Sequence, residues 1–406
     1  MIVSQQPNQY KNNKMITQKE YQNRRTILSS TVSERALDAF LVSSEENIYY
    51  LTGASYKPLE RPFFIVIWPS REPTLVVPML EKEHMEKAGI GNVVAYWEYP
   101  SPRGSGWPEI LQQILGNVSN VGVEPSLSLE IAGKLRDFSL SPMPLIEEMR
   151  LVKSPAEVAM IKKTAEYTDI GMSKILNASY LGASVVEIFS LSKSLQVEVL
   201  RSGDYDPVTS SFLTVTWPAP FSSQPHGIPK AEDRLKSGPL VAMSFHRING
   251  YSAEVERTYF HQQPTKDERE LFEHMTAAGK CAMDLVKPGI PCAEVDAVAN
   301  NYLRENGFAE NLLHRTGHGI GLGNHEGPYV AEGSDETLQE NMVISIEPGI
   351  YIPEIGGFRH SDTVLVTSSG YELLTHSPID LDSLTITNYK PFKRLKGKLI
   401  RRAVGI

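Results

Sequence analysis

The stretch RTGHGIGLGNHEGPYV, residues 315–330, concentrates groups that can do chemistry. His318 and His325 stand among five glycines, and Glu326 and Pro328 follow directly. Imidazole and carboxylate groups bind divalent metals and transfer protons near neutral pH. The stretch alone is consistent with a metal site, with a metal-free catalytic site, or with a glycine-rich loop that contains two histidines. Residues elsewhere in the chain are needed to distinguish these three interpretations.

Composition places the chain among soluble globular proteins. Its 406 residues suffice for two domains of ordinary size, and 41% of them are hydrophobic. The net charge of -8 argues against a nucleic-acid partner, which requires a basic surface. Two cysteines, Cys281 and Cys292, fit a reducing compartment. Because no run approaches about 18 apolar residues and no secretory signal is visible, we expect a cytoplasmic protein without a membrane partner.

Four segments are expected along the chain. Residues 1–15 are rich in Gln and Asn and are expected to be disordered. Residues 16–148 alternate helical segments with β-branched runs such as FFIVIWP, which predicts an α/β domain. Residues 149–390 open with a Ser-Pro pair at 154–155 that is typical of a helix start, and they predict helices packed on an antiparallel sheet. Residues 391–406 are a basic tail.

The C-terminal KPFKRLKGKLIRRAVGI has seven basic residues in seventeen. Phe392, Leu395, Leu399 and Ile400 are interleaved with them. A solvated tail, or one docked on an acidic surface of the same protein, is one interpretation. Contact with a membrane surface or with a partner protein is the other.

Five segments carry most of the candidate acids, bases and ligands: QPHGIPK with His226, GYSAEVERT with Glu254 and Glu256, TGHGIG with His318, NHEGP with His325 and Glu326, and SIEPG with Glu347. Glu254 and Glu256 are two apart in a strand-like run, so their side chains share one face. Paired carboxylates raise each other's pKa unless a cation or substrate lies between them. Singly, each candidate also has a structural interpretation, such as a surface ion pair between Glu256 and Arg257.

Together these segments resemble the pita-bread hydrolase family, which contains methionine aminopeptidase, aminopeptidase P, prolidase and creatinase. The resemblance rests on NIYYLTG, EMRLVKSPAEVAMIKKT, GHGIGLGNHEGP, MVISIEPGIYIP and GFRHSDTVLVT. It implies an α/β N-terminal domain of the creatinase/prolidase type, followed by an α+β pita-bread C-terminal domain. It also implies a homodimer that acts on a small-molecule substrate.

The metallopeptidase members of this family imply two divalent cations held by two Asp, one His and two Glu. Three of these positions carry usable ligands in this sequence: Glu254, His318 and Glu347. The first Asp falls on Met243 without a gap, or on Ser244 with one, and the last Glu falls on Ser361. With two carboxylates lost, we expect no dinuclear site. A single divalent cation on the remaining three ligands is the alternative.

Where the peptidase pattern fails, the segments resemble creatinase, the metal-free branch. That resemblance implies catalytic roles for His226 as proton carrier and for Glu256 and Glu347 as binders of a cationic group. It assigns the substrate's carboxylate to Arg61 of the neighbouring subunit. The other predicted substrate-site residues are Leu59, Glu254, His318 and His325.

The first expectation for function is therefore metal-independent hydrolysis of a C–N bond in a small zwitterionic guanidino- or amino-acid-like molecule, without a cofactor. Creatine itself is not expected, because the second carboxylate-binding Arg of creatinase falls on Pro328 and Leu59 replaces an aromatic ring. Two alternatives stay open. One is a metal-dependent hydrolase or lyase like the Xaa-Pro peptidases with a reduced ligand set, and the other is a non-catalytic binding protein.

Overall fold

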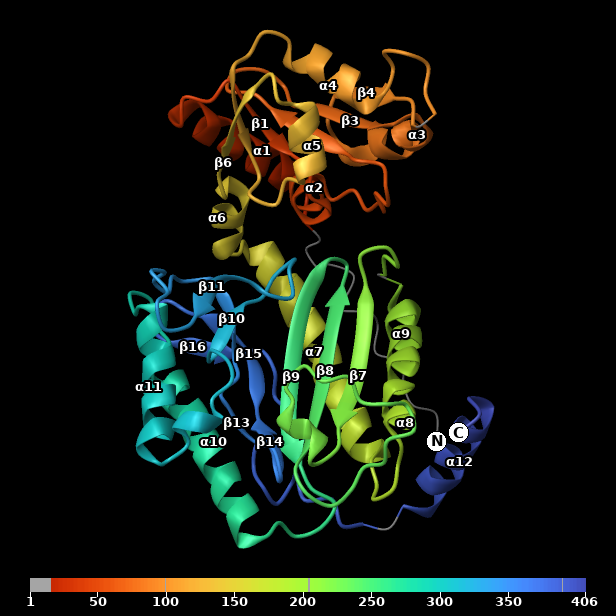
Figure 1. The fold of residues 1–406 in the computed structure, drawn as a ribbon, viewed down its shortest axis with the longest axis vertical. Coiled ribbons are helices and arrows are strands. Elements are labelled where there is room, and N and C mark those ends of the chain that lie inside the picture. The colour runs from red at the N-terminus through yellow and green to blue at the C-terminus, as the bar shows by residue number, and fades with distance from the viewer. Residues whose placement is uncertain (1–15, 99, 204, 389) are drawn as a thin grey trace, which may run out of the picture. The chain divides into compact units, whose positions relative to one another are not determined.

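The chain folds into two compact units, which meet in sequence between Arg150 and Leu151 (Figure 1). The structure, a computed structural model, describes residues 16–406 apart from 99, 204 and 389. The segment 1–15, expected to be disordered, lies outside the described residues. Among the helices that are described, none combines the length and the apolar character needed to cross a membrane.

The N-terminal unit is built on a six-stranded mixed sheet. In spatial order its strands are β4 (Asn92–Tyr96), β3 (Thr74–Pro78), β2 (Phe64–Ile67), β1 (Ala39–Val42), β5 (Asn120–Val123) and β6 (Ser139–Pro142). Strands β1, β2 and β3 lie inside the sheet and are buried along their whole length, which matches their largely apolar sequences. The main helices are α1 (Gln18–Glu34), α2 (Glu45–Thr52), α4 (Trp107–Leu115), α5 (Leu129–Lys134) and α6 (Leu145–Leu151). This confirms the predicted α/β N-terminal domain.

The C-terminal unit contains an eight-stranded antiparallel sheet. Its strands run in the order β11 (Glu326–Val330), β10 (Gly317–Gly319), β12 (Val343–Ile346), β15 (Ser361–Val366), β9 (Tyr251–Tyr259), β8 (Leu240–Ile248) and β7 (Ser211–Trp217), and β16 (Tyr371–Leu373) pairs with β15. A separate hairpin joins β13 (Gly349–Ile352) and β14 (Gly356–Arg359). The helices are α7 (Pro155–Ala178), α8 (Val185–Phe189), α9 (Leu191–Ser202), α10 (Lys266–Leu285), α11 (Cys292–Glu305) and α12 (Pro391–Ala403). Helices on an antiparallel sheet confirm the predicted α+β class.

Helix α7 covers one face of β8, and this contact determines which side chains of β8 point away from the helix. It begins at the predicted Ser-Pro pair, where Ser154 and Glu157 form a capping box. The helix packs on β8 and β9 (Figure 1), and Gly171 permits the close approach, since a Cβ there would collide with Ser244 Oγ and crowd His246 Nε2. Because side chains alternate along a strand, Met243 must point to the opposite face.

The buried His246 makes the fold sensitive to acid. It is fully buried, and burial lowers its pKa from 6.5 to about 3. Between pH 6.5 and about pH 3, His246 is therefore protonated in the unfolded chain and neutral in the folded chain. The free energy of unfolding consequently falls as the pH decreases across this window. We expect His246→Gln to reduce the slope of unfolding free energy against pH by up to about 1.4 kcal/mol per pH unit, measured by urea unfolding between pH 6.5 and 4.

The exposed His84 provides a matched control, because His84→Gln should leave that slope unchanged. His261, whose pKa burial lowers to about 4, keeps part of the acid sensitivity in both variants. An identical slope for the wild type and His246→Gln would show that His246 is not one of the acid-sensitive groups.

Candidate active site

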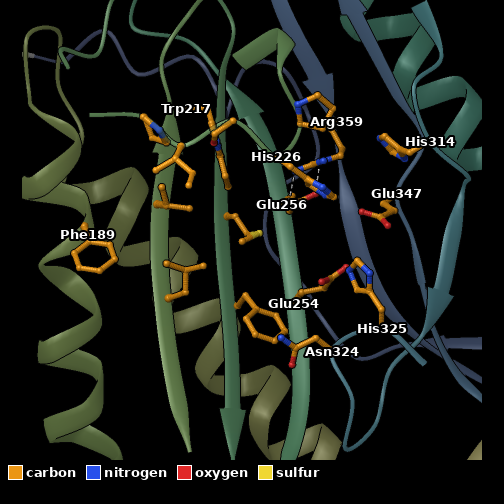
Figure 2. A pocket seen from close by; sticks show the side chains of 18 of the residues that line it. Phe189, Trp217, His226, Glu254, Glu256, His314, Asn324, His325, Glu347 and Arg359 are labelled. Carbon is orange, nitrogen blue, oxygen red and sulfur yellow. Dashed lines mark hydrogen bonds and ion pairs between the residues drawn. The ribbon is translucent and has the colours of Figure 1, made fainter. Parts of the chain in front are cut away.

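A pocket of about 1140 Å³ opens in the C-terminal unit, on the face of β8 that lies away from α7. Its polar wall consists of His226, Glu254, Glu256, His314, Arg315, Asn324, His325, Glu347 and Arg359. Its apolar wall comes from α8, β7 and β8, and includes Phe189, Leu213, Val215, Trp217, Met243 and Phe245. Figure 2 shows Glu254, Glu347 and His325 grouped at one side, with Phe189 and Trp217 at the other. A pocket that joins a large apolar wall to convergent polar groups is typical of a small-molecule site.

Glu254, His318 and Glu347 converge from three parts of the sheet. Glu254 lies on β9, His318 on β10, and Glu347 directly after β12. The Nε2 atom of His318 is 3.7 Å from Oε1 of Glu254 and 3.2 Å from Oε1 of Glu347. One possible ligand atom from each of the three lies within 4.8 Å of the others. We call these three residues the EHE cluster.

Glycines on both sides of His318 allow this convergence. A Cβ on Gly317 would collide with the carbonyl of Ser345 in β12, and a Cβ on Gly319 would collide with the carbonyl of Gly327 in β11. Only glycine lets β10 lie this close to both neighbours. The glycine-rich sequence thus serves strand packing, and it holds His318 between two strands.

The EHE cluster fits one divalent cation. His318 is buried, its Nδ1 is 3.1 Å from the carbonyl oxygen of Gly319, and its Nε2 makes no hydrogen bond within the described residues. An Nδ1–H that donates to a carbonyl leaves a lone pair on Nε2, which is the usual state of a metal-binding histidine. Two carboxylates and one imidazole are ligands typical of zinc and manganese.

A positive charge among the three side chains of the EHE cluster would stabilise them, as the shifts of their pKa values indicate. Burial, reinforced by the charge of Glu347, raises the pKa of Glu254 to about 7. Burial also acts to raise the pKa of Glu347, but His318 and then Arg359 outweigh it and hold that pKa at about 2. Burial alone would lower the pKa of His318, yet contact with Glu347 and the charge of Glu254 raise it. A proton or a divalent cation among the three would stabilise both carboxylates.

The two positions where the metallopeptidase resemblance implies further carboxylates hold Met243 and Ser361. Met243 lies opposite Glu256 across β8 and β9 and lines the pocket, whereas Ser244 faces α7, so the alignment without a gap is the correct one. Ser361 lies across from Glu256 on the other side, and its hydroxyl donates to Oε1 of Glu254 at 3.0 Å. Neither a thioether nor a hydroxyl supplies the negative oxygen that a second hard cation requires. Within the part of the chain that the structure describes, the EHE cluster is the one group of His, Cys, Asp or Glu suited to a metal.

Glu256 forms a buried ion pair with Arg359, shown by dashed lines in Figure 2. Nε of Arg359 lies 2.5 Å from Oε2 of Glu256, and Nη2 donates to Oε1 at 2.6 Å. Burial raises the pKa of Glu256 to about 8 although the guanidinium opposes that shift, and the two-point contact compensates the charge of the carboxylate when it is ionised. The alternative interpretation of Glu256 and Arg257 as a surface ion pair does not hold, because both residues are buried and Arg257 binds Asp362 at 2.7 Å.

The other predicted site residues lie in two places. His226 is exposed on the loop before β8, and His325 stacks on His318 with ring centroids 3.9 Å apart. Burial, and then the charge of His318, lower the pKa of His325 to about 4. In the N-terminal unit, Leu59 is exposed, and Nη1 of Arg61 donates to Glu98 at 3.1 Å. The predicted roles of these four residues stay predictions.

Several residues that line the pocket were not predicted as site residues, among them Arg359 and His314. Arg359 stands two positions before Ser361 in GFRHSD, so its motif was visible, but its partner Glu256 is distant in sequence. His314 precedes the GHG motif and donates to or accepts from the hydroxyl of Tyr351 at 2.7 Å. The apolar wall from α8 and β7 carries no motif at all, since ordinary core residues have the same composition.

Comparison with known proteins supports a peptidase relationship. Residues 24–152 match the Creatinase/Prolidase N-terminal domain, and residues 159–368 match Metallopeptidase family M24. The chain is 31% identical over 371 residues to "Putative dipeptidase YkvY" of Bacillus subtilis (strain 168), which covers 88% of this chain and 99% of that protein. Among solved structures, it is similar to the prolidase from Pyrococcus horikoshii OT3, with a TM-score of 0.77, 29% identity, and coverage of 88% and 100% of the two chains. The Xaa-Pro dipeptidase from Bacillus anthracis gives a TM-score of 0.76, 26% identity, and coverage of 88% and 99%.

These relatives correct two expectations. The predicted metal-independent, creatinase-like hydrolysis and the predicted lack of a cofactor are both wrong, because the relatives are dipeptidases and prolidases and the matched family is one of metallopeptidases. The sequence showed two missing carboxylates, but it could not show that the other three ligands meet within 4.8 Å. The predicted family and fold are confirmed. With a creatinase/prolidase-type domain ahead of a pita-bread domain, the chain belongs to metallopeptidase family M24.

Proposed function

We propose that the protein is a metal-dependent hydrolase of dipeptide-like amides, with Xaa-Pro dipeptides as the leading substrate class, and that it works with one divalent cation. The observation that carries this proposal is the EHE cluster, in which the buried Nε2 of His318 lies 3.7 Å and 3.2 Å from oxygens of two carboxylates. The similarity to a putative dipeptidase, a prolidase and an Xaa-Pro dipeptidase supports the substrate class. Three protein ligands are the usual number in single-metal hydrolytic sites.

A bound cation would supply Lewis acidity and would lower the pKa of a water ligand. The chain's own groups would do the rest. Glu347, held ionised by its neighbours, would supply a permanent negative charge to the cation. Arg359 neutralises Glu256, so that the pocket does not hold three uncompensated carboxylates. His226 and His325 lie where they can donate to a substrate's carbonyl or carboxylate, and the apolar wall can receive its side chain.

The direct test measures metal and activity together. Purified protein should contain about one equivalent of manganese, zinc or iron per chain and should hydrolyse Xaa-Pro dipeptides. A chelator should lower the rate by at least about 100-fold, and the same metal should restore it. Chelator-resistant hydrolysis without bound metal would refute the proposal, and two equivalents per chain would refute the single-cation form.

Assembly and location remain parts of this proposal. We propose a homodimer in which Arg61 reaches the neighbouring site, as the resemblance implies, and sedimentation equilibrium with wild type and Arg61→Gln would test it. We also propose a cytoplasmic location, which two free cysteines favour.

A further inference from the structure

Helix α12 carries an unusual charge for this protein. It contains six basic residues and no acidic one, whereas the whole chain has a net charge of -8. Figure 1 shows α12 beside α8, at the C-terminal end of the chain. The two sides of this helix differ sharply in what they contact.

The inner side of α12 is fixed to the C-terminal unit. A Cβ on the buried Gly397 would collide with the carboxylate of Glu187 and the hydroxyl of Tyr180, so glycine permits this contact. Arg401 forms an ion pair with Glu187, and the guanidinium carbon of Arg394 lies 5.2 Å from the centre of the Tyr180 ring. The predicted basic tail is thus a docked helix, and its rotation about its own axis is set.

The outer side of α12 is an apolar stripe with basic edges. Phe392, Leu395 and Leu399 are 84%, 60% and 61% exposed, and their spacing of three and four residues puts them on one face. With 3.6 residues per turn, that face lies opposite Gly397. The exposed Lys396 borders it on one edge, and the exposed Lys398 and Arg402 border it on the other. Leu and Phe flanked by basic residues are typical of helices that lie in a membrane interface.

A groove next to the stripe provides a second observation. It has a volume of about 370 Å³ and lies between α12 and residues 180–182. Three of its wall residues are cationic: Arg394, Lys398 and Arg401. Leu181 and Leu395 are on the same wall and are about half exposed or more. Arg401 is already paired with Glu187, so a phosphate group that carries an acyl chain would meet Lys398 and the guanidinium of Arg394 beside the exposed leucines.

We propose that α12 docks the protein onto the surface of a bilayer rich in anionic phospholipids. The stripe enters the boundary between headgroups and acyl chains, the edge cations bind lipid phosphates, and the groove takes one headgroup. With 13 residues, α12 is too short to span a bilayer and lies along it. A nucleic acid would use the cations but would leave the leucines in water. This replaces the expectation that the protein has no membrane partner, and it does not depend on the metal site.

Co-sedimentation of the full chain with vesicles tests the proposal. We expect little binding to phosphatidylcholine alone, binding that rises at least about tenfold as phosphatidylglycerol is added, and release at high salt. The double variant Leu395→Gln/Leu399→Gln should lower binding to the mixed vesicles by about tenfold or more, because it removes apolar contact and keeps every charge. Lys396→Gln/Lys398→Gln/Arg402→Gln should abolish the preference for anionic lipid.

Exposed residues elsewhere give matched controls. Leu129 is 91% exposed and Lys266 is likewise exposed, so Leu129→Gln and Lys266→Gln should bind vesicles like the wild type. Thermal unfolding and dipeptide hydrolysis without vesicles should be equal in all variants, which separates membrane docking from folding and from the proposed activity. Equal binding to both lipid mixtures, or unchanged binding of the leucine variant, would overturn the proposal. A second result would also overturn the proposal: a dimer in solution that the leucine variant abolishes, with no vesicle binding by the wild type or the variant. A second copy of the chain would then cover the stripe.

Discussion

Glu347→Gln should lower kcat/KM for dipeptide hydrolysis by about three orders of magnitude and should remove most of the bound cation. Glu347 is the member of the EHE cluster whose pKa is held lowest, at about 2, so its negative charge is present throughout the physiological range. Glutamine keeps the shape of the side chain but supplies neither that charge nor a proton acceptor. The measurements are steady-state kinetics and elemental analysis of the purified variant.

The exposed Glu354 offers a matched control, since Glu354→Gln makes the same chemical change outside the pocket and should keep wild-type kinetics and metal content. Excess metal in the assay separates two roles of Glu347. If activity returns with metal, Glu347 acts mainly as a ligand, and if it does not although the metal is bound, Glu347 has a further role in the reaction. Activity of Glu347→Gln within twofold of the wild type would show that the EHE cluster is not the active centre.

Met243→Asp combined with Ser361→Glu should raise the metal content from about one to about two equivalents per chain. The two positions flank Glu256 across the sheet, Met243 from β8 and Ser361 from β15, and the hydroxyl of Ser361 also donates to Glu254. Two new carboxylates there would supply the missing negative oxygens for a second cation. Without metal, the same variant should unfold at a lower temperature than the wild type, because like charges would crowd a buried site.

Met243→Leu is the control for this variant, because it changes the side chain without adding an oxygen, and its metal content should stay at about one. Isothermal titration with manganese and elemental analysis would both report the number of sites. A count that stays at one in the double variant would mean that something other than these two residues excludes the second cation, with the Arg359 guanidinium as the next residue to substitute.

Much of the fold could be predicted from the sequence. The apolar runs that became β2 and β3 and the Ser-Pro start of α7 are local patterns, and each appears in the structure where it was expected. The family resemblance rested on motifs that are likewise continuous in sequence. The three residues of the EHE cluster could be predicted as ligands from these motifs, because each lies in its own short motif.

The sequence by itself determined the class of each domain, the family, and the candidate ligands, because those depend on neighbouring residues along the chain. The tertiary structure decided how the candidates are used. Strand pairing put Met243, and not Ser244, in the pocket, and it gave Glu256 a partner in Arg359 instead of the adjacent Arg257. The close packing of β10 brought His318 to two distant glutamates, so residues 315–330 contribute one member of a group that could hold a metal ion. Contacts between residues far apart in sequence determine the register between strands and the side that a helix turns toward its neighbours. Local sequence patterns do not contain this information.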